Sequence, residues 1–122
     1  MNIQSMKSGN IAGLILALVD DDNIYRDYMS QILIHQYGCR VFDASNSEEM
    51  LSLLSNNPID CIILDYNMGV ESGLAIGELI KKKFSDPPPI IMLTGEAKER
   101  TIVKAFRGGF SDFLSKLDLN FN

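Results

Sequence analysis

The sequence predicts an open α/β domain whose parallel sheet is covered by helices on both faces. Two observations support this prediction: short apolar segments alternate with segments of helical periodicity, and the short segments are apolar throughout. Strands that alternate with helices of about 11 to 15 residues indicate right-handed crossovers between parallel strands. Strands without an alternating polar face are typical of a sheet that is buried on both sides.

Strand-like and helix-like segments follow one another in a regular order. Strands are expected at 14–19, 39–44, 59–64, 90–93 and 110–115. Apolar residues at intervals of three or four predict helices at 23–37, 45–57, 72–86 and 97–107. Asp22 is the expected N-cap of the first helix, and the Ser45 to Glu48 segment has the pattern of a capping box.

Composition excludes several classes of protein. A chain of 122 residues is long enough for one domain, and 46% hydrophobic with 22% charged residues is ordinary for a globular protein. The longest apolar run, 14–19, is far shorter than the roughly 18 residues of a membrane-spanning helix. A net charge of −5 without a basic cluster argues against direct binding of nucleic acid. Cys39 and Cys61 lack metal-ligand spacing and are expected as free thiols in a reducing cytoplasm.

Polar side chains follow four of the expected strands. Asp20 and Asp21 follow the first, Asp65 the third and Thr94 the fourth, and Lys116 ends the fifth. In open α/β sheets, ligands bind beyond the carboxyl ends of the strands. Each residue alone has an ordinary explanation, such as a loop acid, a helix cap or a surface lysine. Their joint placement at one edge of the sheet favours a common site.

The chemistry of this edge points to a divalent cation. Converging carboxylates repel one another and would take up protons unless a cation joined them. A small number of oxygen ligands from the protein, completed by bound water, favours Mg²⁺. Beside such an ion, Asp65 can act as a nucleophile toward phosphorus, and Thr94 and Lys116 can neutralise charge on phosphoryl oxygens.

At these residues the chain resembles the receiver domains of two-component response regulators. Four motifs carry the resemblance: LVDDD at 18–22, ILDYNM at 63–68 with Gly73, MLTG at 92–95 and DFLSK at 112–116. Each motif is weak alone, but all four in this order are highly specific. The resemblance implies a receiver domain over 14–119 with the flavodoxin-like strand order 2-1-3-4-5. Residues 1–13 are then expected as a disordered leader, and 120–122 as a tail.

The resemblance also implies a role for each site residue. Asp65 would accept a phosphoryl group from a sensor histidine kinase or a phosphotransfer protein. Asp21 would hold Mg²⁺ directly and Asp20 through water, together with Asp65 and the backbone carbonyl of Asn67. The domain would act as a cytoplasmic signalling module that promotes its own phosphorylation and dephosphorylation, not as an enzyme.

Two further roles concern the output of the domain. Thr94 and Lys116 would contact the phosphoryl group, and Phe113 would change position with Thr94 as a switch. An output domain or a partner protein would respond to this change. Asn67 and Glu96 occupy positions at which this family tunes the lifetime of the phosphoryl group.

The sequence departs from the family at three places. Gly69 and Leu117 stand where the family usually has proline, and a trans peptide bond or a rearranged loop is expected before Leu117. The chain stops at Asn122, before the fifth helix that receivers normally have, so part of one sheet face is expected to be bare. The hypotheses are a fragment of a longer protein, or a second chain, such as a homodimer partner, that covers this face.

Two other functions remain open from the sequence. A degenerate receiver would be an interaction module that works without phosphate. A magnesium-dependent phosphohydrolase of the haloacid dehalogenase type would also use an aspartyl nucleophile. Such enzymes need a second acid two residues after the nucleophile, where this chain has Asn67.

Overall fold

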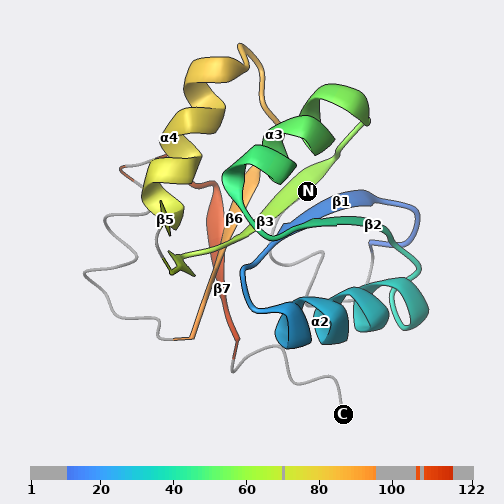
Figure 1. Ribbon diagram of the computed structural model, residues 1–122. Coiled ribbons are helices and arrows are strands. Elements are labelled where there is room, and N and C mark those ends of the chain that lie inside the picture. The colour runs from blue at the N-terminus through green and yellow to red at the C-terminus, as the bar shows by residue number, and fades with distance from the viewer. Residues whose placement is uncertain (1–10, 70, 96–106, 108, 117–122) are drawn as a thin grey trace.

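A five-stranded parallel sheet forms the centre of the molecule (Figure 1). The computed structural model describes residues 11–69, 71–95, 107 and 109–116. The strand order is β2-β1-β3-β6-β7, which confirms the predicted fold class. The strands are β1 Ile15–Val19, β2 Arg40–Ala44, β3 Cys61–Asp65, β6 Ile90–Thr94 and β7 Asp112–Ser115.

Three described helices cover the sheet. The helix α2 (Asn23–His35) lies on one face, and α3 (Ser47–Asn56) and α4 (Gly73–Lys83) lie on the other (Figure 1). An additional antiparallel pair, β4 (Asn67–Met68) with β5 (Glu71–Ser72), follows β3 and was not expected. The helix expected at 97–107 falls outside the described residues, apart from Arg107. No helix found in the described part of the chain is long and apolar enough to cross a membrane.

Local side-chain bonds fix where the helices begin. Asp22 caps α2 as predicted, because its carboxylate accepts hydrogen bonds from the backbone N–H groups of Ile24 and Tyr25. The capping box of α3 lies one residue later than predicted. Asn46 is the cap and accepts from the Glu49 N–H at 2.9 Å, and the Glu49 carboxylate accepts from the Ser45 N–H at 2.7 Å.

The sheet face on the α2 side is buried, so the expectation of a bare face is wrong for the described residues. Ile63, Ile91, Leu93 and Leu114 are each at most 1% exposed. Their side chains form one cluster with those of residues that lie outside the strands, among them Ile11, Met29 and Leu33. The homodimer hypothesis therefore has no support from a bare sheet face in the described residues, although Ile24 and Tyr28 of α2 are exposed on the same side.

The folded part of the chain includes residues that the sequence assigned to a leader. Ile11 is only 2% exposed and belongs to the core. The Gly13 N–H donates to the Gly38 carbonyl at 2.9 Å. Residues 11–13 are thus part of the domain, and the expectation for 1–10 lies outside the described residues. Cys39 and Cys61 are both buried and free, as predicted.

Candidate functional site

Three carboxylates meet at the carboxyl edge of the sheet. Oxygen atoms of Asp20, Asp21 and Asp65 lie within 4.8 Å of one another. Asp20 is 0% and Asp65 4% exposed, whereas Asp21 is open to solvent. The arrangement supplies hard oxygen ligands from both buried and accessible positions, which is the donor set that Mg²⁺ favours.

The register of the central strands explains this convergence. β1 and β3 are parallel neighbours in which Val19 pairs with Leu64. The next residue on each strand is an aspartate, so Asp20 and Asp65 lie side by side. Asp65 is the last residue of β3 and pairs with Leu93, whose carbonyl accepts from the Tyr66 N–H at 2.8 Å. The Asp65 carboxylate therefore sits on a hydrogen-bonded strand end, not on a free loop.

Thr94 and Lys116 reach the same edge from the next two strands. Thr94 is buried at the end of β6, and its carbonyl accepts from the Lys116 N–H at 2.7 Å. The Lys116 Nζ lies 3.4 Å from Asp20 Oδ2 and 3.6 Å from Asp65 Oδ1. The structure thus brings together four strand ends, as the sequence predicted.

Tyr25, which was not predicted from the sequence, contributes an aromatic ring to the site. The Lys116 Nζ lies 4.3 Å from the centre of this ring, which is within the range of a cation–π contact. Tyr25 stands in the first turn of α2, where helical side chains point back toward the helix N-terminus and so toward the site. Burial, and then the negative charges of Asp20 and Asp65, raise the pKa of Tyr25 to about 12, so the phenol stays neutral.

Arg26 is a second residue that sequence reasoning missed. Its Nη1 donates to the Asp20 carbonyl at 2.7 Å, and its Nε donates to Asp43 Oδ2 at 2.9 Å. The Asp22 N–H donates to Asp20 Oδ1 at 2.9 Å. These bonds hold both the backbone and the side chain of Asp20 in place. An arginine one turn after a predicted cap and near two acids was the only sequence feature that could have indicated it.

The charge balance of the site favours a divalent cation. Burial, followed by repulsion from Asp20, raises the pKa of Asp65 to about 6, although Lys116 and a hydrogen bond from the Asn67 backbone lower it. Three ionised carboxylates and one ammonium carry a formal charge of −2, which one Mg²⁺ ion would neutralise. The residues present therefore fit a magnesium ion.

The segment after Asp65 approaches the acids closely. Asn67 opens β4, and Gly69 occupies the left-handed region with φ +69°. A Cβ atom on Gly69 would lie 2.7 Å from Asp21 Oδ2. A proline, with φ near −65°, could not adopt this conformation, so the predicted departure from the family pattern changes the path of the loop.

Phe113 lies apart from the acids. It pairs with Met92 in the β6–β7 register and is partly buried against the core on the side of α3 and α4. Glu96 and Leu117, which the sequence also singled out, lie outside the described residues. The structure therefore brings together Asp20, Asp21, Asp65, Thr94 and Lys116, with Asn67 adjacent and Phe113 on the neighbouring strand.

An open α/β sheet with this set of strand-end residues defines a class of domain that can hold a hard cation beside a small anionic group. The family model of the response regulator receiver domain matches residues 16–119. The chain belongs to this family.

Relatives and solved structures agree with this assignment. The sensory transduction protein LytR of Staphylococcus haemolyticus is 36% identical over 100 residues, which cover 81% of this chain and 38% of that protein. The structure of the chemotaxis protein CheY4 of Vibrio cholerae has a TM-score of 0.76 and 27% identity, with 91% of this chain and 90% of that chain covered.

A Burkholderia pseudomallei response regulator has a TM-score of 0.73 and 27% identity, with 84% of this chain and 59% of that chain covered. Its crystal structure contains a phosphorylated aspartic acid and a calcium ion. The chain spans between 21% and 42% of the length of the curated relatives it matches.

Proposed function

We propose that this receiver domain accepts a phosphoryl group on Asp65 from the phosphohistidine of a sensor kinase or a phosphotransfer protein. The observation that carries the proposal is the placement of the Asp65 carboxylate. It is buried on a strand end, 3.6 Å from Lys116 Nζ and within 4.8 Å of the other two acids. The aspartate is thus surrounded by groups that can hold a cation and stabilise added negative charge.

The transfer places specific demands on Asp65. An ionised carboxylate oxygen of Asp65 attacks the phosphorus atom, the bond from phosphorus to the imidazole nitrogen breaks, and its electron pair returns to that nitrogen. The Lys116 ammonium group neutralises charge on the phosphoryl oxygens, and the Thr94 hydroxyl donates a hydrogen bond to them. Asp65 must lose its proton first, which its raised pKa opposes in the absence of a cation.

Mg²⁺ would be held by Asp21 directly, by Asp20 through water, by Asp65 and by the Asn67 carbonyl. When bound, it supplies positive charge that favours the ionised form of Asp65 and offsets charge on the phosphoryl group. The phosphorylated aspartic acid and calcium ion in the Burkholderia pseudomallei protein support this proposal by analogy.

The new charge on Asp65 would shift the positions of Thr94 and Phe113 and so change the face that includes β7. An output domain or a partner protein would bind the changed face. The positions of the two residues support this coupling. Thr94 ends β6 at the site, and Phe113 of β7 pairs with Met92, which lies two residues before Thr94 in β6.

The test compares modification of wild-type protein, Asp65→Asn and Asp60→Asn. Each protein is incubated with acetyl phosphate, with and without Mg²⁺, and analysed by intact mass spectrometry. Asp60 directly precedes the same strand, accepts from the Ile15 N–H at 2.8 Å and is the matched control. We expect Mg²⁺-dependent addition of one phosphoryl group to the wild type and to Asp60→Asn, and none to Asp65→Asn.

Other results would favour the alternatives. Retention of Mg²⁺-dependent modification in Asp65→Asn would contradict the assignment of the acceptor. Failure of the wild type to react with acetyl phosphate and to bind beryllofluoride would favour a degenerate receiver. Turnover of a small phosphoester such as p-nitrophenyl phosphate would favour a phosphohydrolase, although Asn67 cannot supply the proton transfer that such enzymes need.

A further inference from the structure

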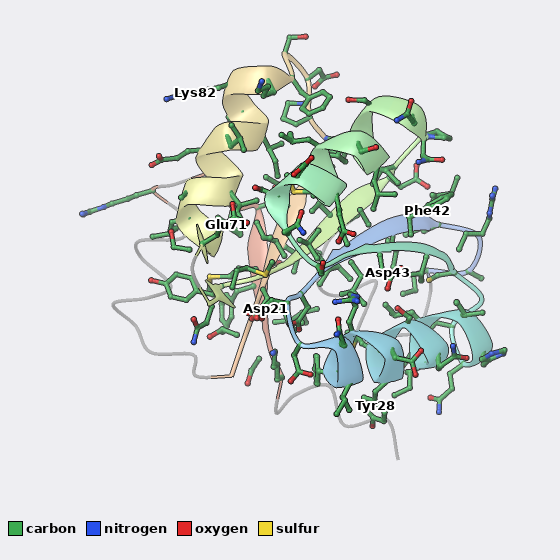
Figure 2. The ribbon with its side chains drawn as sticks, in the orientation of Figure 1. Asp21, Tyr28, Phe42, Asp43, Glu71 and Lys82 are labelled. Carbon is green, nitrogen blue, oxygen red and sulfur yellow. The ribbon has the colours of Figure 1, made fainter. Side chains whose placement is uncertain are left out.

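Glu71 connects the segment after Asp65 to a different helix. Its Oε2 accepts from the Ser47 hydroxyl at 2.5 Å, and its Oε1 accepts from the Ser47 backbone N–H at 3.2 Å. Ser47 is the first residue of α3, and the two residues are far apart in the sequence. Figure 2 shows Glu71, the first residue of β5, close to the start of α3.

The first turn of α3 is well suited to receive this carboxylate. N–H groups in the first turn of a helix lack partners within the helix, and the helix dipole favours negative charge there. Asn46 accepts from the Glu49 N–H, but the Ser47 N–H is left for another acceptor. Glu71 therefore acts as a second cap that comes from outside the helix.

The hairpin that carries Glu71 also borders the proposed magnesium site. Glu71 pairs with Met68, and Ser72 pairs with Asn67, across the antiparallel β4–β5 ladder. The Asn67 backbone forms a hydrogen bond to the Asp65 carboxylate. The turn of the hairpin contains Gly69, where an added Cβ atom would lie 2.7 Å from Asp21 Oδ2. A bond at Glu71 thus fixes the second strand of a hairpin whose first strand contacts the acids.

We propose that Glu71 is a positioning residue that holds the β4–β5 hairpin, and with it the Asn67 carbonyl, at the distance that Mg²⁺ binding requires. This inference rests on the proposed function, because it assumes that the ion binds beside Asp65. The need for such a clamp follows from Gly69, which lacks the fixed φ of a proline and leaves the turn without local stiffness. A bond to α3 supplies the stiffness from a distant part of the chain.

The test measures Mg²⁺ affinity by isothermal titration calorimetry and stability by thermal unfolding in EDTA. The variants are Glu71→Ala, Glu71→Gln and Ser47→Ala, with Glu78→Ala as a control at an exposed glutamate of α4. We expect Glu71→Ala to raise the Kd for Mg²⁺ by roughly tenfold, the low end of the effect of losing a residue that orients a ligand. Glu71→Gln retains one acceptor oxygen and should lie between Glu71→Ala and the wild type.

The double variant with both Glu71→Ala and Ser47→Ala separates an effect on positioning from a general loss of stability. If the bond to Ser47 carries the effect, Ser47→Ala should weaken Mg²⁺ binding in the wild type but not in Glu71→Ala. Affinities within twofold of the wild type for both Glu71 variants, with only the unfolding temperature lowered, would overturn the proposal. If the Glu71 variants keep their Mg²⁺ affinity while Asp65 of the wild-type protein is phosphorylated, the clamp is wrong and the proposed function stands. A Glu71 effect on Mg²⁺ affinity without phosphorylation of Asp65 would support the clamp and contradict the proposed phosphoryl transfer.

Discussion

The two segments that border the site, the Asp20–Asp22 turn and the β4–β5 hairpin, are held in different ways. In the turn, Asp22 caps α2, its N–H bonds to the Asp20 carboxylate, and Arg26 binds the Asp20 carbonyl. All these contacts join residues within six positions of one another. Figure 2 shows Asp21 in this turn and Asp43 on the neighbouring strand β2.

The hairpin depends on contacts between distant residues. Gly69 approaches Asp21, and Glu71 bonds to Ser47 on α3. Ser72 adds a local cap by accepting from the Ala75 N–H at 3.1 Å. The turn thus has several local bonds in addition to its distant ones, such as that between Arg26 and Asp43. The described side chain of the hairpin that reaches another helix, Glu71, is held by a distant bond to α3. Loss of a residue that supports the turn without binding the ion, such as Arg26, should therefore change mainly stability. Loss of a residue that supports the hairpin should change mainly Mg²⁺ binding.

The largest expected effect concerns pH, because the two segments together enclose an excess of negative charge. The pKa of Asp65 is raised from its usual 3.8 to about 6 in the folded protein. Between pH 3.8 and about pH 6, Asp65 is therefore protonated in the folded state but ionised in the unfolded state. Stability should therefore fall as pH rises through this range, by at most about 3 kcal/mol at pH 7. Urea unfolding of the wild type in EDTA at several pH values measures this loss.

Asp65→Asn is the control for this prediction. It removes the titrating carboxyl group, so its unfolding free energy should lack this part of the pH dependence. Saturating Mg²⁺ should flatten the wild-type curve, because a bound cation favours the ionised carboxylate. Parallel curves for the wild type and Asp65→Asn in EDTA would show that the two segments do not raise the pKa of Asp65.

Arg26→Ala tests how firmly the turn is held. Loss of the bonds to the Asp20 carbonyl and to Asp43 should lower the free energy of unfolding by about 2 kcal/mol, since both involve a charged donor and one is partly buried. Mg²⁺ affinity should change by less than about threefold, because the Asp22 cap remains. Arg40→Ala, on an exposed arginine of β2, is the control. A large loss of Mg²⁺ affinity with little loss of stability would contradict the comparison.

The same difference between local and distant contacts explains what the sequence could predict. The strand order, the Asp22 cap and the meeting of Asp65 with Asp20 follow from strand ends and from local patterns. The bond between Glu71 and Ser47 has no local pattern, because it joins elements that meet only after the sheet has formed. The expectation of a bare sheet face was wrong for the described residues, because side chains from outside the strands, among them Ile11 and Met29, form one cluster with the strand residues of that face.

Gly69→Ala tests the hairpin at its turn. Gly13 has a similar positive φ of 85° but open space around it, so Gly13→Ala is a matched control. Both changes should cost about 1–2 kcal/mol of stability, because an alanine is strained in the left-handed region. Only Gly69→Ala places a methyl group against Asp21, so it alone should weaken Mg²⁺ binding in calorimetry. Equal Mg²⁺ affinities for the two variants would show that the hairpin does not constrain Asp21.

Tyr25 gives the smallest effect and tests whether the turn also acts through Lys116. Tyr25→Leu removes the ring near the Lys116 Nζ, a contact worth about 0.5–1 kcal/mol at a partly exposed site. The rate of phosphorylation by acetyl phosphate should then fall by about two- to fivefold, if all of this energy orients the ammonium group toward the phosphoryl oxygens. Tyr25→Phe keeps the ring and should react like the wild type. If Tyr25→Phe were as slow as Tyr25→Leu, the hydroxyl group and not the face of the ring would be responsible, and the cation–π contact would have no part in placing Lys116.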